Sequence, residues 1–219
     1  MRRFLLLCVV AAIALTAGTA SAQWHLGIRM VGSGNYFPYM PALSAGDPMP
    51  LMDAGLFGYK EFIVGYGDKI QGEATFAYDS LDSTLDMDGT DVESGMGWWY
   101  LGVAGHYRLM EGDGYDMTAG LRFQYGSAEL TSDYGYVDSM PVTDMSYTGT
   151  TSQFSVPLRF NWYFADGKIG IGPEVAFKYT TGSTELEFTP EDARVSVTMD
   201  GPEYTGIDTE YSLNLVFLF

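Results

Sequence analysis

The sequence predicts an all-β protein: a closed, antiparallel, eight-stranded transmembrane β-barrel with up-and-down topology. Two observations predict this fold. Beyond residue 22, polar and apolar side chains alternate with period two, and no apolar run is long enough for a spanning helix. The links between the alternating segments are short and long in turn, which places all short links at one end of an antiparallel barrel and all long links at the other.

Residues 1–22 are predicted to be a cleaved signal peptide. Two arginines precede an apolar stretch over residues 4–17, and small residues at positions 20–22 form a cleavage site. Residues 23–219 then form a single outer-membrane β-barrel domain. The only cysteine, Cys8, lies in the signal peptide, so the mature chain has neither a disulfide nor a thiolate metal site.

The alternating segments and the tight turns between them define the expected elements. Three short links, at residues 67–69, 111–114 and 165–167, contain the Gly and Asp residues typical of turns. Four long links, centred near residues 44, 87, 139 and 194, are interpreted as loops. The eight strands are expected over residues 23–32, 56–67, 70–79, 96–109, 115–126, 152–164, 168–179 and 209–219.

The bulky row of each strand is predicted to face lipid. A lipocalin-like barrel would hold this row inside, but an eight-stranded barrel has an interior only just wide enough for side chains to meet. Aromatic residues of the outward rows gather near both strand ends, as interfacial girdles do. They are Trp24, Tyr66, Tyr107, Trp162, Phe164 and Phe219 near the short links, and Tyr78, Trp99, Tyr125, Phe154, Tyr179 and Tyr211 near the long links.

The opposite row combines small residues with charged ones, as a narrow lumen requires. Buried charges persist only when they are paired and hydrogen-bonded, so we expect a filled lumen in place of an open pore. His25 and His106 lie on the same row, where we expect them to line the lumen without a catalytic role. The expected ion-pair network comprises Arg29, Glu61, Glu73, Arg108, Arg122, Arg159, Glu174 and Lys178.

Two prolines fit this pattern poorly. Pro157 and Pro173 fall within the sixth and seventh predicted strands. A closed barrel has no edge, and a proline removes one hydrogen bond from the ladder. We therefore expect a bulge or a shifted strand boundary at each of them.

The chain is strongly acidic, with 28 acidic and 11 basic residues and a formal net charge of −17. Such a charge disfavours nucleic acid as a partner, because binding depends on Lys and Arg neutralising phosphates. Most acidic residues fall in the four long links, together with a single basic residue, Arg194. The simplest interpretation is a solvated outer surface, and the alternative is a surface for divalent cations or cationic partners.

Two of the long links have features of their own. In the second, Asp86, Asp88, Asp91 and Glu93 have the close spacing that Ca²⁺ prefers, although the twelve-residue EF-hand order is incomplete. The first, over residues 35–52, is apolar and rich in Met, Pro and aromatic residues. We interpret it as a lid over the barrel mouth, with contact to the membrane surface or to a partner as alternatives. No cofactor is expected.

The last strand gives the pattern a specific resemblance. Residues 211–219 end in Phe and place apolar residues at alternate positions, which resembles the C-terminal signature of outer-membrane barrels. With the eight-strand, four-loop layout, the chain resembles the small-barrel superfamily that includes OmpX, the transmembrane part of OmpA, OmpW and the opacity proteins. The resemblance implies location in the bacterial outer membrane and insertion by its assembly machinery, with Tyr211, Leu213, Leu215, Phe217 and Phe219 as the recognised strand.

These observations favour a non-enzymatic barrel with a structural or surface-interaction role, a filled polar lumen and acidic loops outside the cell. We expect a monomer surrounded by outer-membrane lipid. The alternative is an OmpW-like passive channel for small or apolar solutes. An enzyme acting on lipid A is the least favoured class, because no Ser-containing nucleophile motif stands near either histidine.

Overall fold

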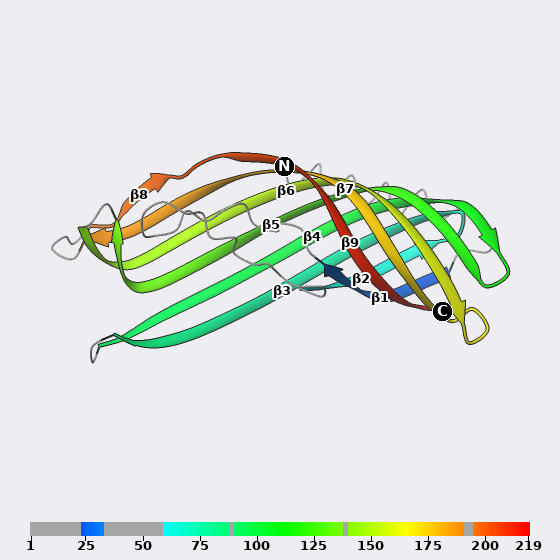
Figure 1. The fold of residues 1–219 in the computed structure, drawn as a ribbon, viewed down its shortest axis with the longest axis horizontal. Coiled ribbons are helices and arrows are strands. Elements are labelled where there is room, and N and C mark those ends of the chain that lie inside the picture. The colour runs from blue at the N-terminus through cyan, green and yellow to red at the C-terminus, as the bar shows by residue number, and fades with distance from the viewer. Residues whose placement is uncertain (1–22, 33–58, 88–89, 138–139, 191–194) are drawn as a thin grey trace.

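The computed structural model describes residues 23–32, 59–87, 90–137, 140–190 and 195–219 (Figure 1). The predicted signal peptide and the apolar first link therefore lie outside the described residues. Within the described part, no helix is long and apolar enough to cross a membrane. The described residues form nine strands: β1 (Gln23–Gly32), β2 (Tyr59–Gly67), β3 (Ile70–Met87), β4 (Thr90–Gly112), β5 (Tyr115–Val137), β6 (Met140–Phe164), β7 (Ile169–Pro190), β8 (Val197–Asp200) and β9 (Tyr204–Leu218).

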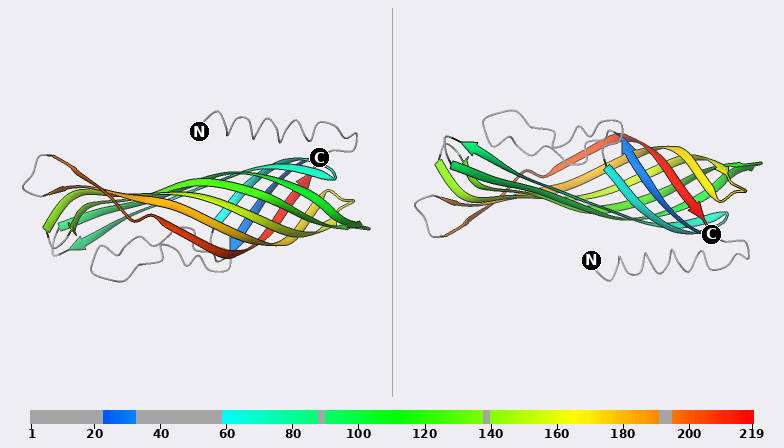
Figure 2. Two further views of the ribbon diagram at one scale, coloured as in Figure 1. Left: turned by 90° about the horizontal axis from the view of Figure 1, so that it is seen from above. Right: turned by 90° about the horizontal axis from the view of Figure 1, so that it is seen from below.

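Eight of these strands close into a ring. Each of β1 to β6 pairs antiparallel with the next strand in sequence. β9 pairs with both β7 and β1 and closes the ring. The remaining strand, β8, is short and pairs only with the outer part of β7 among the described residues. Figure 2 shows the ring at the right of each view, where the C-terminus lies. The predicted closed, eight-stranded antiparallel barrel is confirmed.

The two faces of the strands have the predicted orientation. Phe154, Val156 and Leu158 of β6 are exposed on the outside, whereas Ser155 and Pro157 between them are buried. The predicted aromatic girdles also lie on the outside: Trp24 contacts Tyr66 near the tight turns, with a ring separation of 4.9 Å. Because apolar side chains cover the outside of the ring and polar ones fill its centre, the molecule is arranged for a hydrocarbon solvent.

Three of the four expected long loops are instead largely strand. The β3–β4 hairpin is paired as far as Met87 and Thr90, and the β5–β6 hairpin as far as Val137 and Met140. β7 continues to Pro190. β6 has 25 residues, or about 80 Å at about 3.3 Å per residue, whereas spanning a membrane needs about 9–11. We call the parts of β3 to β7 beyond the girdle of Tyr78, Trp99, Tyr125, Phe154, Tyr179 and Tyr211, together with β8, the extension. In Figure 2 it continues to the left of the ring.

The outward row of β7 shows why the extension escaped prediction. Up to Tyr179 this row is apolar, with Phe177 exposed, and beyond it the exposed residues are Thr181, Ser183, Glu185 and Glu187. The inward row remains buried at Thr184 and Phe188. Period two therefore continues, but the outward residues change from apolar to polar at the girdle. Such a change is expected where lipid gives way to water.

The tight turns lie where they are predicted, but the prolines behave differently. Pro157 pairs with Ala176, and Pro173 pairs with Leu213, without any shift of register. Each proline leaves a gap of two residue pairs in one neighbouring ladder, between β5 and β6 or between β6 and β7. The expected bulge is therefore wrong at both positions. Register shifts occur elsewhere, at Arg108/Met110 in β4 and at Thr143/Ser146 in β6.

Large aromatic side chains fill the outer end of the lumen. Trp98 and Tyr100 of β4 are buried with Val31, Ala77 and Ala128 in one apolar cluster. Gly126 lies directly opposite Tyr100 on β5, and a Cβ atom at this position would come within 2.5 Å of the Tyr100 ring. A glycine here thus makes room for an aromatic side chain inside a barrel of this size.

Candidate functional site

A network of buried charges occupies the middle of the lumen. It contains four cations and four carboxylates, and none of these residues is more than 3% exposed. Because the numbers of opposite charges are equal, the network can be neutral with every group ionised, which is the condition under which buried charges persist. We call it the lumen network: Arg29, Arg122, Arg159 and Lys178 with Glu61, Glu73, Glu174 and Glu210.

Glu73 of β3 is the most connected carboxylate of the lumen network. The guanidinium of Arg159 on β6 donates to both of its oxygens, with N–O distances of 2.6 and 2.9 Å. Arg29 donates to it at 3.4 Å, and the Nε2 atoms of His25 and His106 each lie 3.2 Å from one of its oxygens. Two parallel bonds between a guanidinium and a carboxylate are among the strongest polar contacts in proteins.

The other members bridge neighbouring and distant strands. Arg29 donates to Glu61 at 2.5 Å, and Arg159 donates to Glu174 at 2.8 Å. Arg122 contacts Glu174 and also donates to Glu210 at 3.2 Å. Lys178 lies 3.5 Å from Glu210. The network therefore ties together strands β1, β2, β3, β5, β6, β7 and β9.

The contacts that cross the lumen matter most for any solute. Arg159 on β6 reaches Glu73 on β3, and Arg122 on β5 reaches Glu210 on β9. Gln124 on β5 donates to Glu61 on β2 at 2.5 Å. In each case the two strands are separated by two others in the ring. Side chains from opposite walls therefore meet inside the ring.

Seven of the eight residues predicted for the lumen network lie in it, and Arg108 does not. Arg108 lies near the tight turns, 2.8 Å from Asp68, 3.2 Å from Glu111 and 3.3 Å from Asp116. Asp116 also accepts hydrogen bonds from Asn161 and Tyr163. Arg108 thus belongs to a second, smaller cluster, because its position on β4 is closer to the barrel end than the lumen network is.

Sequence reasoning missed Glu210 and the contacts of both histidines. Glu210 lies on the inward row of β9, four residues before Asn214 on the same row, so strand alternation could have placed it in the lumen. It was missed because it lay at the edge of the expected strand, residues 209–219, whereas β9 begins at Tyr204. That both histidines meet Glu73 could not be read from parity, since it depends on the register between β1, β2, β3 and β4.

The predicted Ca²⁺ ligands lie at the end of the β3–β4 hairpin. Asp86 pairs in register with Asp91, Glu93 pairs with Thr84, and Asp88 lies outside the described residues. In the part of the chain that the structure describes, no group of three or more His, Cys, Asp or Glu residues could hold a metal ion. The Ca²⁺ site remains a prediction.

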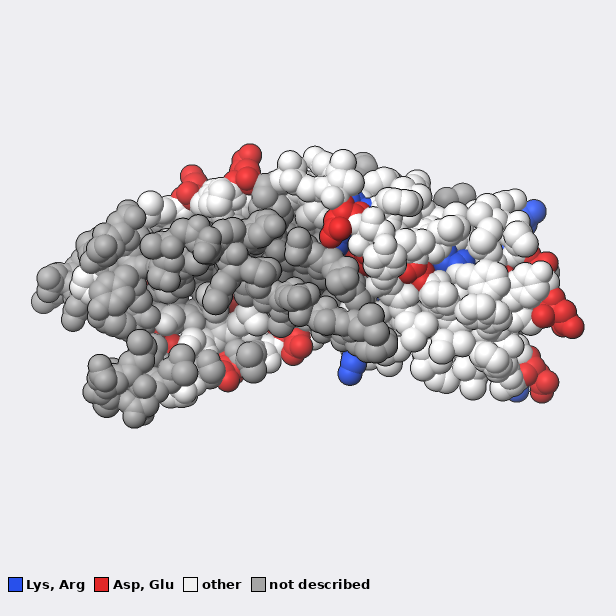
Figure 3. Space-filling model, viewed as in Figure 1, with Lys and Arg blue, Asp and Glu red and all other residues white. Residues whose placement is uncertain are grey.

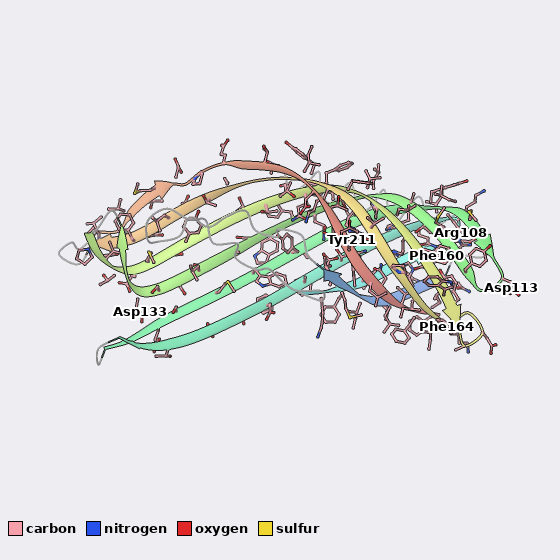
Figure 4. The ribbon with its side chains drawn as sticks, in the orientation of Figure 1. Arg108, Asp113, Asp133, Phe160, Phe164 and Tyr211 are labelled. Atoms are coloured by element: carbon pink, nitrogen blue, oxygen red, sulfur yellow. The ribbon has the colours of Figure 1, made fainter. Side chains whose placement is uncertain are left out.

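The last strand holds the predicted assembly residues on one face. β9 pairs with β1 from residue 211 to 218 and with β7 from residue 204 to 217. Its outward residues are Tyr211, Leu213, Leu215, Phe217 and, just beyond the strand, Phe219. Tyr211, Phe217 and Phe219 are exposed, and Leu213 and Leu215 are half-buried. Figure 4 labels Tyr211 on β9, and Phe160 and Phe164 on the outward row of β6.

Comparisons with known proteins identify the fold. No protein-family model matches the sequence, and no curated protein matches it. A major outer membrane protein from the bacterium Thermus thermophilus has a similar structure, with a TM-score of 0.54 and 8% identity over 91% of this chain and 100% of that one. The chain has the fold of an outer-membrane β-barrel. With its lipid-compatible outer surface, this places it in the bacterial outer membrane.

Two further solved structures are more distant. Acinetobacter baumannii CarO gives a TM-score of 0.42 and 10% identity over 89% of this chain and 97% of that one. Acinetobacter baumannii CarO2 gives a TM-score of 0.39 and 9% identity over 90% of this chain and 98% of that one. The narrower resemblance to OmpX, OmpA, OmpW and the opacity proteins stays a prediction.

Proposed function

We propose that this barrel is non-enzymatic, keeps its lumen closed, and presents an acidic β-structured surface outside the cell. The observation that carries the proposal is the lumen network, in which arginines and carboxylates from opposite walls meet across the ring. A solute would have to break several paired, buried contacts at once. Because separating buried partners leaves each charge without its compensating one, we expect an open state to be rarely populated.

The conductance of the refolded protein in planar lipid bilayers tests the closed lumen. The proposal predicts no steady single-channel steps. Heat-modifiable migration of the same preparation on SDS gels checks that the protein is folded, so that absence of conductance is not the result of an unfolded sample. Steady steps from the wild-type protein would support the rival function, a passive channel.

The contacts of the two histidines support a non-enzymatic role. Both imidazoles are buried, and the Nε2 atom of each contacts Glu73 inside the lumen. A general base must reach the proton that it removes from a substrate, and lipid substrates lie outside the ring. Lipid A extracted from cells that overproduce the protein should therefore have an unchanged mass spectrum, and a new modified species would contradict the proposal.

The extension supports the surface role. Asp82, Glu93, Glu129 and Asp133 are exposed on its outer face. Figure 3 shows acidic side chains along the extension and at the end of the tight turns, with largely uncharged surface between them. We propose that the extension attracts divalent cations or cationic partners, that the barrel is a monomer in outer-membrane lipid, and that the assembly machinery inserts it through its last strand.

A further inference from the structure

Hydroxyl side chains follow the aromatic girdle at the base of the extension. Two residues beyond the girdle, on the same outward row, lie Ser80 on β3, Ser127 on β5, Ser152 on β6, Thr181 on β7 and Thr209 on β9. The girdle at the tight turns differs, because the residues two positions beyond Tyr66, Tyr107 and Phe164 are Asp68, Leu109 and Asp166. Hydroxyl residues therefore mark one side of the membrane and not both ends of the barrel.

On β5, β6 and β7 these side chains join a second row of hydroxyls. Ser152 pairs with Thr181, and Thr150 pairs with both Ser127 and Ser183. We call these five residues the hydroxyl face, and each of them is exposed or half-buried. Register partners on one face of a sheet have Cβ atoms about 4.5–5.5 Å apart, so the five side chains form one continuous array.

The hydroxyl face keeps hydrogen-bonding capacity for a neighbour. Within it, the hydroxyls of Thr150 and Ser183 lie 3.1 Å apart, and Ser127 donates to the carbonyl oxygen of Gly149 at 3.0 Å. The hydroxyls of Ser152 and Thr181 have no hydrogen-bond partner among the described residues. A hydroxyl group has one donor and two acceptor lone pairs, so the face can both donate to a partner and accept from it.

The distance from the girdle places the hydroxyl face beside lipid headgroups. Its two rows lie two and four residues beyond the girdle, which is about 5 and 10 Å along the membrane normal for tilted strands. The headgroup region is about 5–8 Å thick on each side of the hydrocarbon. The face also continues directly from the lipid-facing surface, because Tyr125 of the girdle is the register partner of Ser152. The inner row thus lies among headgroups, and the outer row suits a headgroup larger than that of a phospholipid.

The charges around the hydroxyl face favour an uncharged headgroup over a phosphate. No described Lys or Arg lies on the outward face of the extension, and Glu129 and Glu185 add negative charge next to the hydroxyl face. Lys60 is an exposed lysine on β2, which β3 and β4 separate from β5. A phosphate on the hydroxyl face would therefore lack the cationic partner that makes its hydrogen bonds strong.

A sugar ring fits both parts of this surface. Its hydroxyls match those of Ser and Thr, and its apolar C–H face can pack on the rings of Tyr125 and Tyr179. We propose that the hydroxyl face binds the saccharide headgroups of glycolipids in the surrounding outer leaflet. The choice of leaflet rests on the proposed position of the extension outside the cell. The contact with sugar does not, and it is tested in nanodiscs that have the same lipids on both sides.

Nanodiscs of phosphatidylcholine with rising fractions of a monoglucosyl diacylglycerol test the proposal, with the methyl NMR signals of Thr150 and Thr181 as the readout. Phosphatidylglycerol with the same acyl chains is the matched lipid, since its headgroup has hydroxyls and also a phosphate. The proposal predicts shifts that saturate with the glycolipid and not with phosphatidylglycerol. Shifts that do not saturate, or that saturate equally with both lipids, would overturn it.

Methyl glucoside in solution separates a membrane headgroup from a free sugar. Added to nanodiscs without glycolipid, it should leave both methyl signals unchanged, because no acyl chains hold it at the girdle. Saturation of the same signals by methyl glucoside would show a site for soluble sugars and overturn the assignment to a lipid headgroup.

Two variants separate the hydroxyl face from the rest of the extension. Ser152→Ala removes one unpartnered hydroxyl and should weaken glycolipid association about two- to tenfold, the range for one neutral hydrogen bond. Thr131→Val removes a hydroxyl from the outward row of β5, six residues beyond the girdle, and should leave the association unchanged. Heat-modifiable migration confirms that both variants are folded. Equal effects of the two variants, or no effect of Ser152→Ala, would overturn the proposal.

Discussion

Replacing Glu73 by Gln should destabilise the barrel strongly, although the two side chains have nearly the same shape. The substitution removes the charge that Arg159 contacts at 2.6 and 2.9 Å and that Arg29 contacts at 3.4 Å. It leaves four buried cations with three carboxylates in the lumen network. Removing one partner of a buried ion pair costs about 3–5 kcal/mol, because the other charge is left uncompensated.

Urea-dependent folding into lipid vesicles, followed by tryptophan fluorescence and heat-modifiable migration, measures this cost. Glu185→Gln removes the same charge from the exposed face of β7 and serves as the control, with an expected change below about 0.5 kcal/mol. In addition, Glu73→Gln combined with Arg159→Met should cost less than the sum of the two single changes. Equal stability of Glu73→Gln and Glu185→Gln, or strict additivity in the double variant, would refute the role given to the lumen network.

Two further predictions concern the lipid-facing surface and the lumen. Val103 pairs with Ala74 and Phe123 between the two girdles, so Val103→Arg should lower the free energy of unfolding by about 2–4 kcal/mol, whereas Thr131→Arg on the extension should cost little. Equal costs in the urea titration would contradict the assigned membrane position. Gly65→Ala should disturb His25, because a Cβ atom at Gly65 would lie 2.1 Å from its Nε2 atom. The His25 imidazole signals should shift in NMR spectra, and unchanged signals would show that the ring does not lie against Gly65.

Strand parity and volume predicted the ring, its tight turns and its two faces. These features depend on local alternation and on a single global fact, the narrowness of an eight-stranded interior. The long hairpins were missed because an apolar outward row was the criterion for a strand. In the extension that row carries Glu129 and Asp133 while the inward row continues, so the criterion ends the strand at the girdle.

Membership of the lumen network was predictable in kind, but the partners were not. Parity places Arg108 and Arg159 on the same inward face, yet they belong to different clusters. Which charges meet depends on the register of each ladder and on its stagger around the ring. The position of Glu73 opposite Arg159 is fixed by the successive pairings of β3 with β4, β4 with β5 and β5 with β6, which the sequence does not encode locally.

Measuring which solvent surrounds the outward row of β7 tests the central claim most directly. Because Cys8 is the only cysteine, single cysteines placed after residue 22 can carry a spin label alone once residues 1–22 are removed. Labels at Val175, Phe177, Ser183 and Glu185 in lipid vesicles report collision with oxygen, which concentrates in hydrocarbon, and with a water-soluble nickel complex. The account predicts oxygen access at Val175 and Phe177 and nickel access at Ser183 and Glu185, with the change near Tyr179. Nickel access along the whole row would show that water surrounds the ring and would contradict the account.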